Sequence, residues 1–443
     1  MTKHQIDPRQ CSDSDLTRHL LAARGTQWMR GNRGDPYALI LRAQGIDPHF
    51  LYRGMRGQPV LRQAESDVWV VADHAAGAQI LADERLAPAA PGGGRRRRPR
   101  VFGIDSSSTL KHVLSVDDSL LALDHEERRR LTELVGPALG VAGLERWHGP
   151  VREEFTAALD AAGDSFDLVN DVLRPGVAAV LDRMLGLGPE RRTRLQALGP
   201  DLSPVLDALL CPPTLNGARR LVASVDALRE LLDEVVAERV GEDADGGAER
   251  DLLAALRAVA GEQDTVTALM LAAGVGSEVA VTLTGNAVLA LLDHPDQWEL
   301  LRGDPGAAGD AVEETLRFEP PVRLDSRIAG QRMEIAGQEI GKGDQVVVLV
   351  DAANRDPGLL SGAEEFRLGR PGRADHLSLA DGSHLALLAP MVRLLATGAL
   401  ASLAAAPGAA LLRRDGDVVH RMRTPVTRSI ARCPLTRPGV TPR

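Results

Sequence analysis

The sequence predicts a mainly α-helical protein with small β-sheets. From about residue 124 to the high 240s, apolar residues recur at three- and four-residue spacing, which is the period of helices with one buried face. Residues 264–292 form a further helical pattern that is apolar on nearly all sides, so this helix should run through the core. Two short apolar stretches, 58–72 and 333–350, are instead typical of strands.

The remaining elements can be placed in order along the chain. Residues 58–72 hold two apolar clusters that suit a short strand pair, and Asp73 is positioned to cap a helix running to Leu86. Residues 88–100 are rich in Pro, Gly and Arg and should form a loop. A last long helix is expected over 387–404.

Composition excludes several classes of protein. The formal net charge of -9 over 443 residues argues against nucleic acid as the main partner. The cysteines Cys11, Cys211 and Cys433 are too few and too scattered for a disulfide framework or a zinc site, so no metal is expected. Glu278 interrupts the longest apolar stretch, and the first residues lack the apolar core of a signal peptide. We therefore expect a cytoplasmic protein without a membrane span.

Glu314-Thr-Leu-Arg317 places a carboxylate and a guanidinium one helical turn apart on the same face. Such a pair is common on surface helices and is weak by itself. Three further segments follow it in order: Phe318-Glu-Pro-Pro-Val-Arg323, Ser326-Arg-Ile-Ala329 and Ala353-Asn-Arg-Asp-Pro357. Leu379-Ala-Asp-Gly-Ser-His-Leu-Ala-Leu-Leu388 then runs as a loop into the last helix.

This series, in this order and spacing, resembles the bacterial cytochrome P-450 superfamily over essentially the whole chain from about residue 30. The resemblance implies a single P-450-like domain at 26–435, between an N-terminal tail at 1–25 and a C-terminal tail at 436–443. It also assigns five residues to the structural scaffold beneath the haem: Glu314, Arg317, Asn354, Arg355 and Asp356.

Two departures from the family pattern concern its chemistry. Ala386 stands where the resemblance implies a haem-ligating cysteine, and a methyl group cannot bind iron. In the central helix the family carries an acid followed by threonine, whereas here Glu278 is followed by Val279 and Ala280. Two glycines of the ligand loop are also replaced, which removes backbone freedom. We therefore expect no catalytic residues and no cofactor.

Several other residues match the family's contacts to the haem propionates: His125, Arg129, Arg327 and His376. Charged donors in an apolar interior need anionic partners, so an anion could still sit there. Alternatively, they are inherited residues now satisfied by Asp, Glu, backbone or water. His384 or His376 could also serve as a rewired iron ligand, although the residue matching His384 is not directed at the iron in the family.

One branch of the superfamily fits these departures, namely the haem-free auxiliary proteins of antibiotic glycosyltransferases. The resemblance, strongest to the anthracycline and macrolide types, implies a non-catalytic partner that activates or stabilises a TDP-deoxysugar-dependent glycosyltransferase. Two alternatives stay open: a haem protein or monooxygenase with altered histidine ligation, and a haem-free carrier of the polyketide aglycone. Neither nucleic acid nor a membrane is expected as a partner.

The N-terminal segment offers candidates for partner binding. Trp28, Met29 and Tyr37 are of residue types enriched in interface cores, although their clustering also fits a packed N-terminal cap. A large empty hole is unfavourable in a close-packed interior. We therefore expect Leu387, Leu388 and Met391, or a shifted central helix, to fill part of the vacant haem position.

Overall fold

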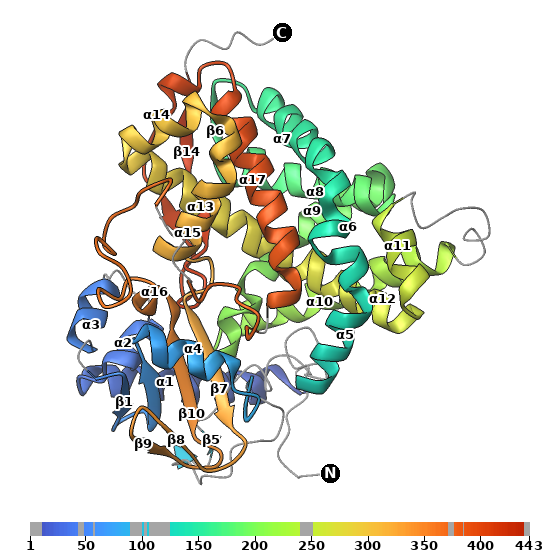
Figure 1. Ribbon diagram of the computed structural model, residues 1–443. Coiled ribbons are helices and arrows are strands. Elements are labelled where there is room, and N and C mark those ends of the chain that lie inside the picture. Colours follow the sequence, from blue (N-terminus) through green and yellow to red (C-terminus); the bar gives the residue numbers. More distant parts are fainter. Residues whose placement is uncertain are drawn as a thin grey trace.

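The computed structural model describes residues 11–42, 48–55, 58–88, 100–101, 104–105, 125–239, 251–370, 376–383 and 385–437. A large helical part occupies the upper portion of the molecule in Figure 1, and a sheet with the N-terminal helices lies below it. The expected fold class, mainly helical with small sheets, is confirmed.

The main sheet joins segments that are far apart in the sequence. Its strand order is β1 (Val60–Gln63), β2 (Val68–Val71), β10 (Gln345–Leu349), β7 (Leu324–Ala329) and β3 (Leu86–Pro88). β1 and β2 pair antiparallel, which confirms the predicted strand pair, and β10 joins β2 in parallel and β7 antiparallel. The strand-like stretch 333–350 contains β8 (Met333–Ile335), β9 (Gln338–Ile340) and β10.

Helix α4 (His74–Ala82) follows β2 and packs against the sheet. The Asp73 side chain accepts a hydrogen bond from the Ala76 N–H at 2.8 Å, so the predicted cap is confirmed. The helix ends before the predicted Leu86, because Leu86 begins the strand β3 that pairs with β7. Most of the predicted loop 88–100 lies outside the described residues.

The helical part is built from elements of very different length. The longer helices besides α4 are α1 (Asp13–Asn32), α2 (Pro36–Arg42), α3 (Pro48–Met55), α5 (His125–Leu139), α7 (His148–Ala162), α8 (Arg174–Leu185), α9 (Gly188–Leu202), α10 (Leu215–Glu238), α11 (Leu252–Val259), α12 (Glu262–Leu269), α13 (Ser277–Asp293), α14 (Pro295–Gly303), α15 (Ala308–Phe318) and α17 (Ala389–Ala405). The short helical elements are α6 (Val141–Leu144), α16 (Val350–Ala353), η3 (Glu145–Trp147), η4 (Leu168–Leu173), η5 (Ser203–Val205), η6 (Asp207–Leu209), η10 (Pro305–Ala307), η11 (Ala386–Leu388) and η12 (Ala409–Leu411).

Helices α12 and α13 form the predicted central helix. A π-helical turn, η9 (Met270–Gly276), joins them without a break. α13 is buried along nearly its whole length and lies beside α17, which also packs against α7 (Figure 1). By length and composition both long helices could cross a membrane, but their apolar windows are mostly buried in the fold, as in core helices.

Small sheets tie the chain ends to the helical part. β14 (Pro434–Thr436) pairs with β6 (Ser165–Asp167) and β11 (Arg413–Arg414). Three further strand pairs are β12 (Val419–His420) with β13 (Ile430–Arg432), β4 (Arg100–Val101) with β5 (Ile104–Asp105), and β8 with β9. All of these pairs are antiparallel.

Both predicted domain limits need correction. Helix α1 begins at Asp13, capped by Ser12, and its Leu16 and Leu20 are buried against Ala218 of α10, so residues 13–25 are folded and not a tail. At the other end β14 reaches Thr436, and the fully buried Arg437 donates to the Leu159 carbonyl at 2.6 Å. Residues 438–443 lie outside the described part of the chain.

Candidate functional site

Helix α15 carries Glu314 and Arg317 one turn apart on its buried face. Arg317 Nε donates to Glu314 Oε2 at 2.9 Å, and Arg317 Nη2 donates to Oε1 at 2.8 Å. Both side chains are almost completely removed from solvent. A buried ion pair is stable only when further hydrogen bonds satisfy its remaining atoms, so the surroundings of this pair decide its role.

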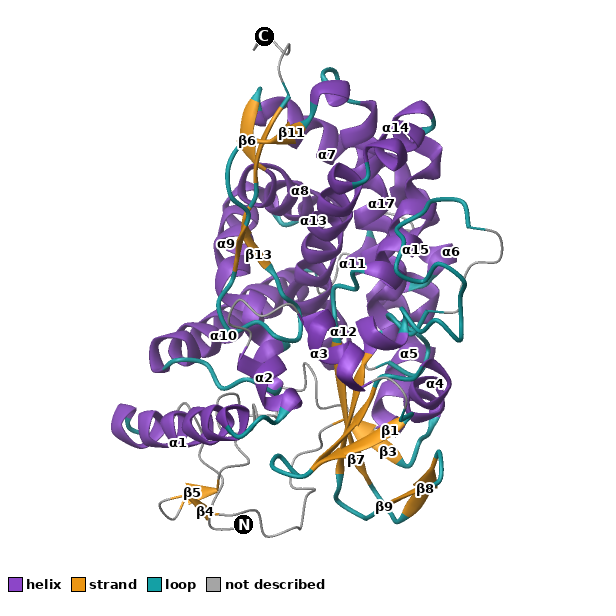
Figure 2. Ribbon diagram, turned by 90° about the vertical axis from the view of Figure 1, so that its left-hand side faces the viewer, coloured by secondary structure: helices purple, strands orange, loops and turns teal. Residues whose placement is uncertain are grey.

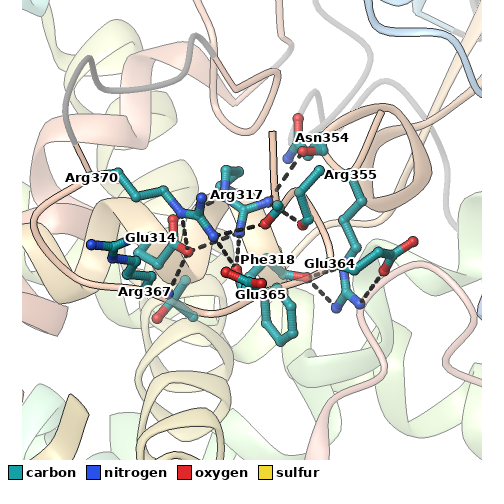
Figure 3. A network of polar contacts seen from close by, with 12 residues as sticks. Glu314, Arg317, Phe318, Asn354, Arg355, Glu364, Glu365, Arg367 and Arg370 are labelled. Atoms are coloured by element: carbon teal, nitrogen blue, oxygen red, sulfur yellow. Dashed lines mark hydrogen bonds and ion pairs between the residues drawn. The ribbon is translucent and has the colours of Figure 1, made fainter. Parts of the chain in front are cut away.

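Those further bonds come from the irregular segment after α16 (Figure 3). Arg317 donates to the carbonyl oxygens of Ala363 and Glu365, both at 2.7 Å. Glu314 accepts from the backbone N–H of Arg367 at 2.8 Å. The pair is therefore a hub that fixes a segment without regular structure, and its role here is structural.

Asn354, at the end of α16, connects three parts of the chain. Its amide nitrogen donates to the Leu316 carbonyl at 3.1 Å and to Ser378 Oγ at 2.9 Å. Its side-chain oxygen accepts from the Leu377 N–H at 2.8 Å. This one buried side chain thus holds α15 and the start of the loop before α17 in place.

Arg355 and Asp356 complete the predicted scaffold. Arg355 Nε donates to the Phe318 carbonyl at 2.9 Å, its Nη2 donates to Glu319 at 2.7 Å, and its guanidinium carbon lies 3.8 Å from the centre of the Phe318 ring. Asp356 accepts from the His74 N–H at 3.2 Å, at the start of α4. The structure therefore brings the scaffold residues to one junction between helices and sheet.

The loop before α17 runs over 376–388 and ends in η11, whose first residue is the half-buried Ala386. No cysteine lies in this loop. Gly382 packs so closely on α4 that a Cβ atom there would overlap the Leu81 carbonyl. The Gly382 carbonyl accepts a hydrogen bond from Arg327 Nη2 at 2.8 Å, so the loop is held from two sides.

Apolar side chains from η11 and α17 approach the π-helical turn of the central helix. A Cβ atom on Gly276 would lie only 2.6 Å from Met391 Cε and 3.7 Å from Leu388 Cδ1. Leu387, Leu388 and Met391 are all buried. Leu388 and Met391 therefore pack closely against the central helix at Gly276.

The acid of the central helix is already engaged by an arginine. Glu278 and Arg174 of α8 form a bidentate pair, with Arg174 Nη2 donating to Glu278 Oε2 at 2.8 Å. Both side chains are buried. Gly199 of α9 makes room for the pair, because a Cβ atom there would lie only 2.4 Å from Arg174 Nη1. Next to Glu278, Val279 is a buried apolar residue. Glu278 therefore locks α13 to α8, and Val279, the residue that follows it, carries no hydroxyl.

One of the predicted propionate contacts is exposed, and the side chains of two predicted histidines are not described. Arg129 is exposed on α5, and its Nη1 lies 4.0 Å from Glu133 Oε1. The helix α5 begins at His125, but the His125 side chain and the whole of His384 lie outside the described residues. The structure therefore does not bring the predicted set together at one site.

Arg327 is buried and His376 is half-buried, and both face protein carboxylates. Arg327 Nε donates to Asp325 at 2.8 Å, and His376 Nε2 lies 3.0 Å from Glu313 Oε2. Burial raises the pKa of Glu313, but hydrogen bonds from His376 and Arg393 outweigh it and lower that pKa to about 2. One nitrogen of each residue, Arg327 Nη1 and His376 Nδ1, has no hydrogen-bond partner within the described part of the chain.

The residues present do not fit a thiolate-ligated haem. The position implied for the ligand is Ala386, and Leu388 and Met391 pack where the loop meets the central helix. The carboxylates of Glu278 and Glu313 are committed to protein cations. Within the described residues no group of three or more His, Cys, Asp and Glu side chains could hold a metal ion.

The three residues predicted to bind a partner differ in exposure. Trp28 and Met29 lie on the outer face of α1 and are 55% and 42% exposed. Tyr37 is only 3% exposed, because α2 folds back against α1 and places its ring in the core. Tyr37 is therefore a packing residue, and its prediction as a contact residue was wrong.

Sequence reasoning also missed two features. Arg174 was not identified, although an acid in an apolar central helix demands a cation somewhere in the fold. Leu21 was overlooked as well, although it precedes Trp28 by seven residues and so shares its helix face.

Comparison with known proteins places this geometry in a family. A model of the family described as Cytochrome P450 matches residues 309–386, from α15 to Ala386. AknT of Streptomyces galilaeus is 39% identical over 436 residues, which cover 96% of this chain and 97% of AknT. DesVIII of Streptomyces venezuelae is 35% identical, covering 97% of this chain and 95% of DesVIII. EryCII of Saccharopolyspora erythraea, described as a cytochrome P450 family protein, is 30% identical, covering 95% and 97%.

Solved structures agree with the sequence relatives. The crystal structure of CalO2 superposes with a TM-score of 0.72 at 28% identity, covering 89% of this chain and 96% of CalO2. P450BioI, crystallised with an acyl carrier protein carrying hexadec-9Z-enoic acid, gives the same TM-score at 25% identity, covering 88% and 98%. The resemblance inferred from the motifs is thereby confirmed, and the chain belongs to the cytochrome P450 family.

Proposed function

We propose that this protein is a non-catalytic partner of a TDP-deoxysugar-dependent glycosyltransferase in polyketide antibiotic biosynthesis. It binds that enzyme in a hetero-oligomer in the cytoplasm and keeps it folded and active. One observation carries the proposal: the scaffold around Glu314 and Arg317 is complete, whereas Ala386 and Val279 stand at the positions implied for iron ligation and oxygen activation. A retained fold without the residues implied for catalysis fits a protein that acts by binding a partner through its surface.

The relatives support the same branch of the family. AknT, DesVIII and TylM3 of Streptomyces fradiae match at 39%, 35% and 32% identity and cover at least 94% of this chain. Relatives described as oxygenases or hydroxylases cover less of it, such as the 6-deoxyerythronolide B hydroxylase at 71%. The full-length matches thus favour the haem-free auxiliary group over the catalytic members.

An activator of this kind works by mass action. A protein that binds the active conformation of an enzyme better than other conformations raises the active fraction in proportion to its differential affinity. At a concentration about 100 times the dissociation constant, binding also adds roughly 2.7 kcal/mol to the enzyme's free energy of unfolding. No catalytic residue is needed for either effect.

The test is to co-express the chain with the glycosyltransferase encoded in the same biosynthetic gene cluster. We expect the two proteins to co-purify in a fixed ratio, and transfer from the TDP-deoxysugar to the aglycone to fall strongly when this chain is omitted. An enzyme that is equally soluble and active alone, and that does not bind this chain, would refute the proposal.

Two measurements on the purified chain separate the alternatives. A Soret band with near-stoichiometric iron would indicate a haem protein with altered ligation, for which His376 and His384 are the ligands to replace. Calorimetric titration with the aglycone alone would detect a carrier. The cavity beside Glu278 and Arg174 measures only about 30 Å³, far below the roughly 300–1,000 Å³ of typical small-molecule sites.

A further inference from the structure

The outer face of α1 presents large apolar side chains to solvent. Leu21 and Trp28 are 56% and 55% exposed, and Met29 follows on the same side. Positions seven and eight residues apart lie on one face of a helix, and Gly25 between them leaves that face without a side chain. The opposite face, with Leu16 and Leu20, is buried. α1 is therefore apolar on both sides, although only one side meets the fold.

The C-terminal turn at 421–428 lies next to this helix. Met422 is 70% exposed, and the turn is fixed by Asp207, which accepts from the Val426 N–H at 2.7 Å and from Thr427 Oγ at 2.6 Å. The segment that contains Asp207 also supports α1, because Gln27 Nε2 donates to the Leu210 carbonyl at 2.8 Å. The segment 207–210 thus holds both α1 and the turn by hydrogen bonds.

Arg24 of α1 and Arg423 of the turn are two cations of this region. Arg24 lies one turn from both Leu21 and Trp28, and it feels the positive charge of Arg423. Burial and this repulsion lower the pKa of Arg24. In the described part of the chain neither guanidinium forms an ion pair with an acid, although the whole protein carries a net charge of -9.

The Trp28 ring is already held in place. The Arg42 guanidinium carbon lies 5.6 Å from the ring centre, and Arg42 is itself bound to the side-chain oxygen of Asn32 at 3.0 Å. An exposed tryptophan with a fixed orientation loses little conformational freedom on binding, which favours it as an interface anchor. In Figure 2, α1 lies at the edge of the molecule, away from the central helices.

We propose that Leu21, Trp28 and Met29 of α1 form the docking surface for the glycosyltransferase, and that the turn carrying Met422 borders it. The matching surface of the enzyme is apolar and carries at least one carboxylate that pairs with Arg24 and Arg423. Such a carboxylate relieves the repulsion between the two cations and supplies the opposite charge that this junction lacks. This inference rests on the proposed function, because it assigns a place on the chain to that partner.

The apolar part of the surface is tested by affinity measurements with the co-purified glycosyltransferase. Leu21→Ser should weaken binding by about tenfold and Trp28→Ala by about thirtyfold, as for central interface residues. Leu300→Ser on α14 is the matched control, since Leu300 is 58% exposed, and it should bind as the wild type does. All three variants should keep the wild-type melting temperature, because the side chains are exposed.

The charged part has a signature that a structural role would not produce. Arg24→Met removes one of two repelling cations, so the free chain should melt at a higher temperature while its affinity for the enzyme falls about tenfold. Arg24→Glu should weaken binding more than Arg24→Met does. A residue needed only for packing would instead lower the melting temperature in both variants.

The possible results are distinguishable. If the wild-type chain binds the enzyme but Leu21→Ser and Trp28→Ala bind equally well, the docking surface lies elsewhere and the proposed function stands. If the wild-type chain does not bind the enzyme, both proposals fail. The chain alone could instead sediment as a dimer, and Leu21→Ser as a monomer. The exposed face of α1 would then bind a second copy of this chain, which would overturn the docking assignment.

Discussion

The two sides of the loop before α17 are organised in different ways. On the α15 side, charged and polar groups form a closed network in which Arg317 and Asn354 each have several partners. On the side of the central helix, apolar side chains meet, with Met391 and Leu388 packed on Gly276. A charged pair on that side joins Glu278 to Arg174 of another helix.

This difference shows which constraints survive when chemistry is lost. A buried polar network is costly unless all its members are satisfied, so single substitutions within it are penalised and the network persists. A binding cavity has no such constraint. Once its ligand is not needed, filling it with apolar side chains improves packing and stability. The scaffold is therefore the part of the site that the chain shares with its family, and the packed side is the part on which the proposed function depends.

The largest effect is expected from breaking the network. Arg317→Ala removes the bidentate cation from the buried Glu314, leaves Arg370 at 3.2 Å as its remaining cation and frees two carbonyls, which should cost about 3–5 kcal/mol of unfolding free energy. Urea denaturation measures this loss. Arg18→Ala is the matched control, because Asp15 and Arg18 have the same i, i+3 spacing on an exposed surface and should contribute less than about 0.5 kcal/mol. Equal losses for the two variants would contradict the assigned role.

A smaller loss is expected on the other side. Glu278→Ala leaves Arg174 buried without a counter-charge, which should destabilise the chain by about 3 kcal/mol. Replacing both partners, Glu278→Leu with Arg174→Met, should restore most of that loss, since apolar residues often substitute well for a buried pair. If Glu278→Ala left stability unchanged, Glu278 would have to be kept for a purpose other than locking α13 to α8.

The third effect depends on pH. The folded-state pKa of Glu313 is about 2, below its ordinary value of 4.5, because His376 and Arg393 hydrogen-bond to the carboxylate. A lowered carboxyl pKa contributes stability above the unfolded-state value and loses it as pH falls through the folded-state value. Wild-type stability should therefore decrease between about pH 4.5 and 2. Glu313→Gln should flatten this part of the profile; an unchanged slope would show that other carboxyls cause it.

Local patterns in the sequence were sufficient for much of the fold. The apolar run 264–292, the cap at Asp73 and the strand pair in 58–72 each follow from side-chain periodicity or a local hydrogen bond, and the structure contains all three. The start of α1 was missed, although Ser12-Asp-Ser-Asp15 carries the spacing of a helix cap. The scaffold residues were identified through motif order.

The rest depends on contacts between distant segments. Arg174 and Glu278 are 104 residues apart, and only the packing of α8 against α13 brings them together. Tyr37 and Trp28 look alike in sequence, but the fold of α2 onto α1 buries one ring and leaves the other in solvent. Neither the ion pair nor the difference in exposure follows from the local spacing of residues. The sequence could therefore suggest Trp28 and Tyr37 as surface residues, but it could not show which of the two is buried.

The smallest effect is expected from restoring the lost thiol. Ala386→Cys adds one atom at a half-buried position and should change the unfolding free energy by less than about 0.5 kcal/mol. It should produce neither a Soret band nor bound iron, because Leu388 and Met391 still pack on Gly276 and no hydroxyl follows Glu278. Purification from haem-supplemented cells with iron analysis measures this, and Ala386→Ser serves as control. Stoichiometric haem in Ala386→Cys would mean that the side of the central helix is still a haem-binding cavity. The absence of a thiol at position 386 would then be sufficient to explain why the wild-type chain binds no haem.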